Sequence, residues 1–295
     1  MANKSIIGHL AIFSANLIYG ANYSIAKLVM PVHIKPFGFI LLRVLGATLL
    51  FWLSGLMIKE EIAKEDYKRL FWCGFFGVAL NQLMFFAGLN LTVPINASII
   101  MICTPVLVVI ISHYLLKEKF TWYKVSGITL GIAGALLLIL SGKKVNMSNG
   151  NPLGDFFILI NASSFAIYLV IAKPLIQKYH VVTISKWMFL IGLLLVAPFG
   201  FKELGEVKWE FFTPGLYWAT AFVVVAVTYL AYLGNNYGLK KLNPGIVSFY
   251  IYLQPFLAAL VAMLLGTDKI TIVKVSAALI IFTGIYLISL KPKSI

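Results

Sequence analysis

The sequence predicts an all-α integral membrane protein, with ten transmembrane helices arranged as two inverted five-helix repeats and both termini in the cytoplasm. Three observations predict this fold class: ten long apolar stretches, an uneven distribution of Lys and Arg between them, and an internal repeat. The 295 residues are 61% hydrophobic and 12% charged. The apolar stretches leave almost no chain for a soluble domain.

Each apolar stretch is interpreted as one helix, because about 20 mainly apolar residues span the hydrocarbon core of a bilayer. In lipid the backbone must satisfy its own hydrogen bonds, which a helix does. The first stretch is long and lacks a cleavage signal, so we expect a retained helix rather than a signal peptide. The predicted spans are Ser5–Val29, Pro36–Ile58, Leu70–Leu91, Pro94–Leu116, Thr121–Ser141, Leu153–Ile176, Ile184–Phe201, Pro214–Asn236, Pro244–Gly266 and Ile270–Leu290.

The basic residues predict the orientation, because cytoplasmic loops carry an excess of Lys and Arg. If the N-terminus is cytoplasmic, 15 of the 24 basic residues lie on the cytoplasmic side and 7 on the opposite side. This bias favours both termini inside and an even number of spans. The net charge of +14 is spread singly or in small groups, so it does not indicate nucleic-acid binding.

The second half of the chain repeats the first. At a shift of 150 residues, 15 of the 54 positions from Gly88 to Ser141 are identical, and Pro105 coincides with Pro255. We therefore expect two five-helix repeats, 1–146 and 147–295, within one integrated membrane domain. Because five is odd, the second repeat enters the membrane from the opposite side. Inverted repeats of this kind are typical of transporters.

Several residues of the first half carry a family resemblance. They are Gly88, Leu89, Pro105, Glu118, Thr121, Gly131 and Gly134, together with Arg43 and Ala47. Their arrangement resembles the EamA-type module, which occurs twice in ten-helix members of the drug/metabolite transporter superfamily. The second half departs from the pattern, with Asp268 in place of Glu and no Arg matching Arg43.

The resemblance implies a transporter of small metabolites. Many bacterial members export amino acids or related compounds, and relatives in eukaryotic organelles exchange sugar phosphates or nucleotide sugars. We therefore expect a secondary transporter in the inner (plasma) membrane that exports amino acids or related neutral or zwitterionic solutes by alternating access. The alternatives are an organic-anion, sugar-phosphate or nucleotide-sugar exchanger, and a membrane scaffold or channel.

No enzyme or cofactor is expected. The sequence has no Walker A motif, nucleophile elbow or paired catalytic acids. Its four His have no metal-ligand partner at a useful spacing. The expected partners are a small-molecule substrate and the lipid bilayer, without nucleic acid, and the expected state is a monomer or a weak homodimer.

Polar residues within the spans predict the binding site, because a polar side chain that faces lipid is costly. They concentrate in spans 1, 3, 4, 6, 8 and 9, which we expect to line a cavity, whereas spans 2, 5, 7 and 10 contact lipid. The alternative is structural, since such residues also form hydrogen bonds between helices. The predicted substrate-binding residues are Asn16, Tyr19, Tyr23, Asn81, Gln82, Thr104, Asn161, Ser164, Tyr168, Tyr229, Tyr232, Tyr252 and Gln254.

Five other residues within the spans have more than one interpretation. Pro105 and Pro255 each remove a helix hydrogen bond near the middle of a span, so they are hinge or gate residues or tolerated kinks. Arg43 could snorkel, cap backbone carbonyls or bind a substrate anion. Gly127 and Gly131 form a small-residue face for close helix packing or for a subunit contact.

The acidic residues bear on energy coupling. Seven of the ten lie in loops, and Glu118, Asp155 and Asp268 lie at span ends. None is near the bilayer centre, where proton-coupled carriers keep a carboxylate. We therefore expect facilitated diffusion or exchange down the substrate's own gradient.

Overall fold

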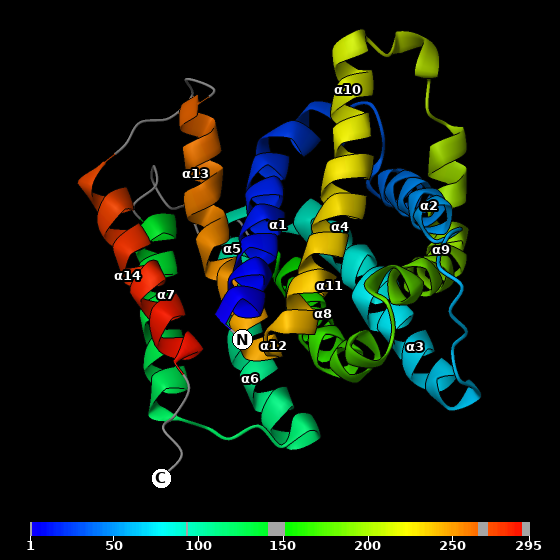
Figure 1. The fold of residues 1–295 in the computed structure, drawn as a ribbon. Helices are drawn as coiled ribbons and strands as arrows, with labels where there is room; N and C mark the ends of the chain where they lie inside the picture. The colour runs from blue at the N-terminus through cyan, green and yellow to red at the C-terminus, as the bar shows by residue number, and fades with distance from the viewer. Residues whose placement is uncertain (1, 93, 141–150, 265–270, 291–295) are drawn as a thin grey trace.

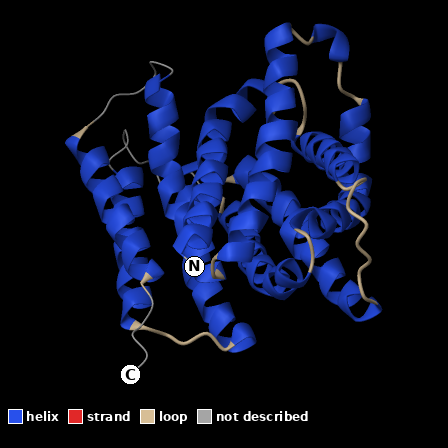
Figure 2. Cartoon of the chain, viewed as in Figure 1, coloured by secondary structure: helices blue, strands red, loops and turns tan. Residues whose placement is uncertain are grey.

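The computed structural model of the chain describes residues 2–92, 94–140, 151–264 and 271–290, and within these ranges every regular element is a helix (Figure 2). Three features of the sequence prediction lie outside the described residues. They are most of the connection Gly142–Asn151, which holds the predicted boundary between the repeats, Asp268, and the side chain of Tyr23.

The first half contains five helical segments, two of which are composite. They are α1 (Ala2–Val29), α2 (Pro36–Ser54), the joined α3 (Tyr67–Gly74), η2 (Phe75–Ala79) and α4 (Leu80–Leu91), the pair α5 (Pro94–Met101) and α6 (Cys103–Leu116), and α7 (Trp122–Leu140). A short turn, η1 (Lys64–Asp66), precedes α3.

The second half repeats this order. Its segments are α8 (Pro152–Lys178), α9 (Val181–Gly205), the joined α10 (Pro214–Phe222), η5 (Val223–Leu230) and α11 (Ala231–Lys241), the joined α12 (Pro244–Phe249), η6 (Tyr250–Leu253) and α13 (Gln254–Leu264), and α14 (Ile272–Ser289). A short turn, η4 (Trp209–Phe211), precedes α10.

Nine helical segments of the described residues are long and apolar enough to cross a membrane. The remaining predicted span is occupied by α1, a helix of 28 residues. The composite segments 64–91 and 214–241 also contain 28 residues each, more than the sequence predicted. At 1.5 Å per residue such a helix is about 42 Å long, so it extends beyond the hydrocarbon into the interface.

The helices bend at matching places in the two halves. The third segment contains the π-helical turn η2 and the eighth contains the π-helical turn η5. The fourth segment is interrupted at Ile102, and the ninth contains the 3-10 helical turn η6. Each irregularity lies just before the predicted hinge proline of its segment, Pro105 or Pro255. Proline cannot donate a backbone hydrogen bond and its ring disturbs the preceding turn, which explains both interruptions.

α7 and α14 pack closely along one edge of the molecule (Figure 1). A Cβ atom on Gly127 would lie 2.9 Å from the Gly284 carbonyl oxygen, and one on Gly134 would lie 3.0 Å from the Ala277 carbonyl oxygen. Residue numbers therefore rise along α7 as they fall along α14, so the two helices are antiparallel. The small residues allow this close contact.

The small-residue face of α7 is used within the chain. Gly127 meets α14, and Gly131 receives the ring of Tyr252, whose Cδ2 would lie 2.3 Å from an added Cβ. Both glycines are buried. The interpretation of this face as a subunit contact is therefore wrong, because neighbouring helices of the same chain already cover it.

α2 and α9 form a second antiparallel pair, at the opposite edge in Figure 1. The Gly38 amide donates to Glu203 Oε2 at 2.9 Å near one end, and the rings of Phe51 and Phe189 lie 5.0 Å apart near the other. Half of each helix is buried, compared with 28% of α7. The second and seventh spans, predicted as outer helices, bury one face against each other and another against the centre, and they expose apolar side chains such as Leu49 and Leu194 on the remaining surface.

Candidate functional site

Arg43 lies inside the protein, seven residues after the start of α2, and is only 6% exposed. Its Nε donates a hydrogen bond to Thr228 Oγ1 at 3.0 Å. The guanidinium carbon lies 5.7 Å from the ring centroid of Phe39 and 5.5 Å from that of Phe86. Aromatic rings attract a cation in this geometry. The guanidinium is therefore held between α2, α4 and η5 and does not snorkel to the membrane surface.

Thr228 is positioned by the π-helical turn η5. Its hydroxyl donates to the carbonyl oxygen of Val223, five residues earlier, at 2.8 Å. Because the hydroxyl hydrogen is engaged there, the oxygen accepts from Arg43. π-helical turns occur frequently at functional sites, and this one fixes the partner of a buried charge.

Two predicted site residues lie near Arg43, and a third lies beside one of them. Tyr19 and Tyr232 are close enough to interact with it electrostatically, and the Tyr232 hydroxyl donates to the Gly77 carbonyl oxygen at 3.3 Å. Gln82 lies beside Tyr232 and is 4% exposed, yet neither atom of its amide makes a hydrogen bond of good geometry. We refer to Tyr19, Arg43, Gln82, Thr228 and Tyr232 as the central polar cluster.

No carboxylate contacts Arg43 among the described residues. The ion pairs there join Glu206 to Lys35, Glu118 to Lys124, and both Glu65 and Asp66 to Lys178, at the ends of helices. The part of the chain that the structure covers also holds no cluster of His, Cys, Asp and Glu suited to a metal ion. The positive charge of the central polar cluster is therefore surrounded by neutral groups.

A second polar contact joins α1 to α13. Gln254 Nε2 donates to Asn16 Oδ1 at 3.0 Å, and Asn16 Nδ2 donates to the Ile12 carbonyl oxygen at 2.8 Å. Gln254 also lines a cavity of about 230 Å³ together with Tyr252 and Pro255. Three predicted site or hinge residues thus line this cavity, and Gln254 links it to Asn16.

Other predicted site residues tie helices together. Asn161 Nδ2 donates to the Asn81 carbonyl oxygen at 2.7 Å. Ser164 Oγ donates to the Phe76 carbonyl oxygen, within the π-helical turn η2, at 2.7 Å. These bonds join α8 to η2 and α4, and a helix-packing role explains them.

Tyr168 belongs to a buried network. Its hydroxyl donates to Asn236 Oδ1, and Asn236 Nδ2 donates to Ser185 Oγ at 3.1 Å. The Tyr168 ring covers Gly77, where an added Cβ would lie 2.5 Å from its Cδ2. Every member is buried, so this network connects α8, α9 and α11.

Three predicted residues make separate contacts. The Tyr229 ring lies 4.7 Å from the Phe51 ring, and the Tyr252 hydroxyl donates to the Ile102 carbonyl oxygen at 3.1 Å. Thr104 is fully buried, and its hydroxyl makes no hydrogen bond with the described residues. The structure therefore divides the predicted set into several groups instead of assembling one cavity.

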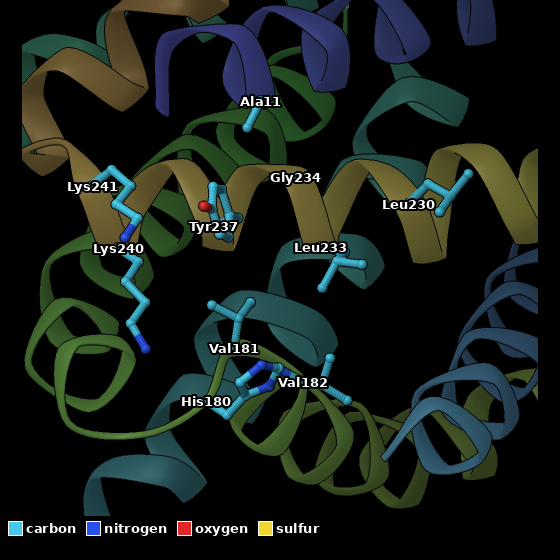
Figure 3. Close-up of a pocket in the computed structure, with 10 residues that line it drawn as sticks. All are labelled: Ala11, His180, Val181, Val182, Leu230, Leu233, Gly234, Tyr237, Lys240 and Lys241. Carbon is cyan, nitrogen blue, oxygen red and sulfur yellow. The ribbon is translucent and has the colours of Figure 1, made fainter. Parts of the chain in front are cut away.

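A larger cavity, of about 560 Å³, lies between α1, the start of α9 and α11 (Figure 3). Lys240, Lys241 and His180 lie toward one end of it, and Leu230 lies toward the other. None of the predicted substrate-binding residues lines it. It forms a groove beside the central helices.

Sequence reasoning undervalued Arg43 and missed Thr228. Span 2 contains few polar residues, so it was expected to face lipid, and the single Arg within it was the signal that one of its faces is buried against the centre. Thr228 has no comparable signal in the sequence, because its role depends on the π-helical turn.

A protein-family model described as the EamA-like transporter family matches residues 6–140 and 152–290. The chain belongs to this family. An uncharacterized transporter of Archaeoglobus fulgidus is 24% identical over 96% of this chain and 97% of its own length. The uncharacterized transporter YoaV of Bacillus subtilis is 27% identical over 94% of this chain and 95% of its own length.

The fold is shared with a solved crystal structure that is 18% identical, with a TM-score of 0.80, and that covers 98% of this chain and 97% of its own. Membership of the EamA-like transporter family makes the chain a multi-pass membrane transporter of small molecules and not an enzyme. It also confirms the family resemblance predicted from the sequence.

Proposed function

We propose that the transporter is a secondary carrier that works by alternating access, with ten spans arranged as two inverted repeats. The observation that carries this proposal is that contacts between the halves occur twice. An added Cβ on Gly46 of α2 would lie 2.4 Å from Val224 of η5, and one on Gly192 of α9 would lie 2.4 Å from Val78 of η2. Gly192 follows Gly46 by 146 positions and Val224 follows Val78 by 146 positions. The two contacts therefore join equivalent residues of the two halves.

This arrangement suits alternating access. Two halves with the same internal structure and opposite orientation can exchange conformations, which opens one central site to either side in turn. The two π-helical turns and the interruptions before Pro105 and Pro255 are places where the spans can bend. Pro105 and Pro255 act as hinge residues in this mechanism.

The proposed cargo is an amino acid or a related neutral or zwitterionic solute, moved out of the cell across the inner (plasma) membrane. The central polar cluster is rich in amide, hydroxyl and aromatic groups and contains a single charge. A multiply charged phosphate would require several Arg or Lys side chains. Within the predicted set, Tyr19, Gln82, Tyr232, Asn16 and Gln254 are the proposed substrate contacts.

Counterflow tests the transport mechanism. Proteoliposomes holding the purified transporter are loaded with unlabelled amino acids, and the uptake of each labelled amino acid is followed. A carrier shows faster uptake when the same solute is present inside, because the loaded carrier reorients with substrate in both directions. Uptake without this trans-stimulation would indicate a channel and contradict alternating access.

Substitution of three proposed contacts tests the site. We expect Gln82→Ala, Tyr232→Ala and Gln254→Ala each to reduce transport at least tenfold while the protein is still expressed and inserted. Thr283→Ala is the matched control, because Thr283 is exposed on α14 and its hydroxyl donates to the Leu279 carbonyl oxygen of the same helix. If all three variants transported like the control, the site would lie elsewhere.

A further inference from the structure

The buried charge of Arg43 requires an explanation that helix packing does not give. A cation in the hydrocarbon region is costly, and such residues normally pair with an acidic side chain or reach the interface. Arg43 does neither among the described residues, since it is 6% exposed and its one hydrogen bond goes to the neutral Thr228. Because burying an unpaired cation is unfavourable, we expect the positive charge of Arg43 to have a function in the transporter.

The surroundings of Arg43 leave one edge of the guanidinium available. Phe39 and Phe86 lie close to it at 5.7 and 5.5 Å, and Thr228 occupies Nε. No described acceptor bonds to the two terminal nitrogens. These two nitrogens form a planar pair of donors, which matches the two oxygens of a carboxylate.

Gln82 is a second independent sign of an unfilled site. Its side chain is 4% exposed and lies beside Tyr232, and neither atom of its amide makes a hydrogen bond of good geometry. A buried amide without partners is energetically unfavourable, so such groups normally have a ligand or a partner. Tyr232 lies beside the Gln82 amide and is close enough to Arg43 to interact with it electrostatically, so the Gln82 amide and the unpaired guanidinium belong to one cluster.

The charge occurs in only one of the two halves. The shift of 146 residues that relates Gly46 to Gly192 relates Arg43 to Phe189, whose ring lies 5.0 Å from the Tyr232 ring. On that side the polar groups of Tyr168 and Asn236 are already paired with each other. The site therefore has one cationic anchor, which suits a single negative charge.

We propose that the substrate of the transporter carries a carboxylate, and that this carboxylate binds the two terminal nitrogens of Arg43, with Gln82 as a further donor. The inference rests on the proposed function, because it names the substrate class of the central polar cluster. It applies both to a zwitterionic amino acid and to a monocarboxylate. It excludes amines and amides that lack a carboxylate.

Binding to the purified full-length transporter tests the proposal. The probes are the twenty amino acids, their carboxamides, and the acids that lack the amino group, with affinities taken from the shift in unfolding temperature. We expect some of the acids to bind and their carboxamides to bind at least tenfold more weakly. In Arg43→Gln the affinity for those acids falls about 10- to 100-fold. Arg69→Gln, which alters an exposed Arg, retains the parental affinities.

A second pair of variants decides the question if Arg43→Gln does not fold. Thr228→Asp places a carboxylate where Oγ1 now lies 3.0 Å from the Arg43 Nε. This carboxylate pairs with the guanidinium and competes with the carboxylate of the substrate. Thr228→Asn has a similar shape without the charge. We expect the acids to bind Thr228→Asp at least tenfold more weakly than Thr228→Asn.

Four results would overturn the proposal: no acid in the panel binds, a carboxamide binds as tightly as its acid, Arg43→Gln binds like the parent, or the two Thr228 variants bind alike. The counterflow assay separates this outcome from the fate of the proposed function. Counterflow of a solute without a carboxylate would support the carrier function and contradict the proposed carboxylate site. Arg43-dependent binding of acids without counterflow would support the carboxylate site and contradict the carrier mechanism.

Discussion

At the scale of single residues, the polar side chains of the transporter's interior differ in whether their hydrogen bonds are satisfied. Tyr168 and Asn236 satisfy each other, and Asn236 also bonds to Ser185. Arg43 keeps donors that no described residue accepts, and the Gln82 amide makes no hydrogen bond of good geometry. A satisfied buried group stabilises the fold, whereas an unsatisfied one is available to a substrate.

Tyr168 was predicted to bind substrate, and its contacts predict a structural role that can be tested. Tyr168→Phe removes the hydroxyl and leaves Asn236 Oδ1 buried without a donor. We expect the free energy of unfolding to fall by about 1–3 kcal/mol while the affinity for substrate is retained. Thermal or denaturant unfolding of the purified protein measures the change.

Tyr217→Phe is the control for this prediction, because the Tyr217 hydroxyl bonds to the Trp209 carbonyl oxygen at the exposed end of α10. Its effect should stay within about 0.5 kcal/mol. A large loss of substrate affinity in Tyr168→Phe, with no change in stability, would restore the sequence-based assignment.

At the scale of helices, the length and position of the spans follow from the apolar pattern, because lipid leaves the backbone no other partner. Which face a span buries does not follow from it. An apolar helix that packs on a neighbour and one that contacts lipid have the same composition. α2 and α9 were therefore expected outside, although each buries half of its residues.

The irregular turns within the spans could be predicted from the sequence only where a proline causes them. The prolines indicate the interruptions before Pro105 and Pro255, because proline breaks the hydrogen-bond pattern. The π-helical turns η2 and η5 contain neither proline nor a polar signature, and they decide which side chains meet at Arg43. The candidate site could be predicted only in part, as a set of polar residues without their partners.

The close contact of α7 and α14 gives a prediction at this scale. Gly127→Val and Gly134→Val each introduce atoms where the facing backbone oxygen lies 2.9–3.0 Å from the Cβ position. We expect each to lower the free energy of unfolding by about 1–3 kcal/mol, since the two helices must move apart. Gly215→Val is the matched control, because the nearest atom to its Cβ position lies 3.9 Å away.

Equal stabilities of the three variants would show that the α7–α14 contact tolerates separation.

At the scale of the whole molecule, the distribution of carboxylates bears on the energy source. Asp155 lies in the first turn of α8 and accepts hydrogen bonds from Thr92 and Asn96. The other described acidic residues lie in connections or at helix ends. A carboxylate at the bilayer centre, which would bind a coupling proton, is missing from the described part of the chain.

We therefore expect transport in proteoliposomes without a pH gradient or a membrane potential, driven by the substrate gradient alone. Imposing a proton gradient should change the initial rate less than twofold for a substrate of fixed charge. Uptake that requires the proton gradient would contradict this expectation, and Asp155→Asn would then be the first variant to examine.

The central claim is that the two halves of the transporter have the same structure in opposite orientations across the membrane. Single cysteines in a background without Cys73 and Cys103 test it, at Val32 and its counterpart connection at His180, and at Met57 and its counterpart at Phe211. All four positions are exposed. An impermeant thiol reagent added outside intact cells should label Val32→Cys and Phe211→Cys, and Met57→Cys and His180→Cys should react only from the cytoplasmic side. Labelling of both members of either pair from the same side would contradict the claim.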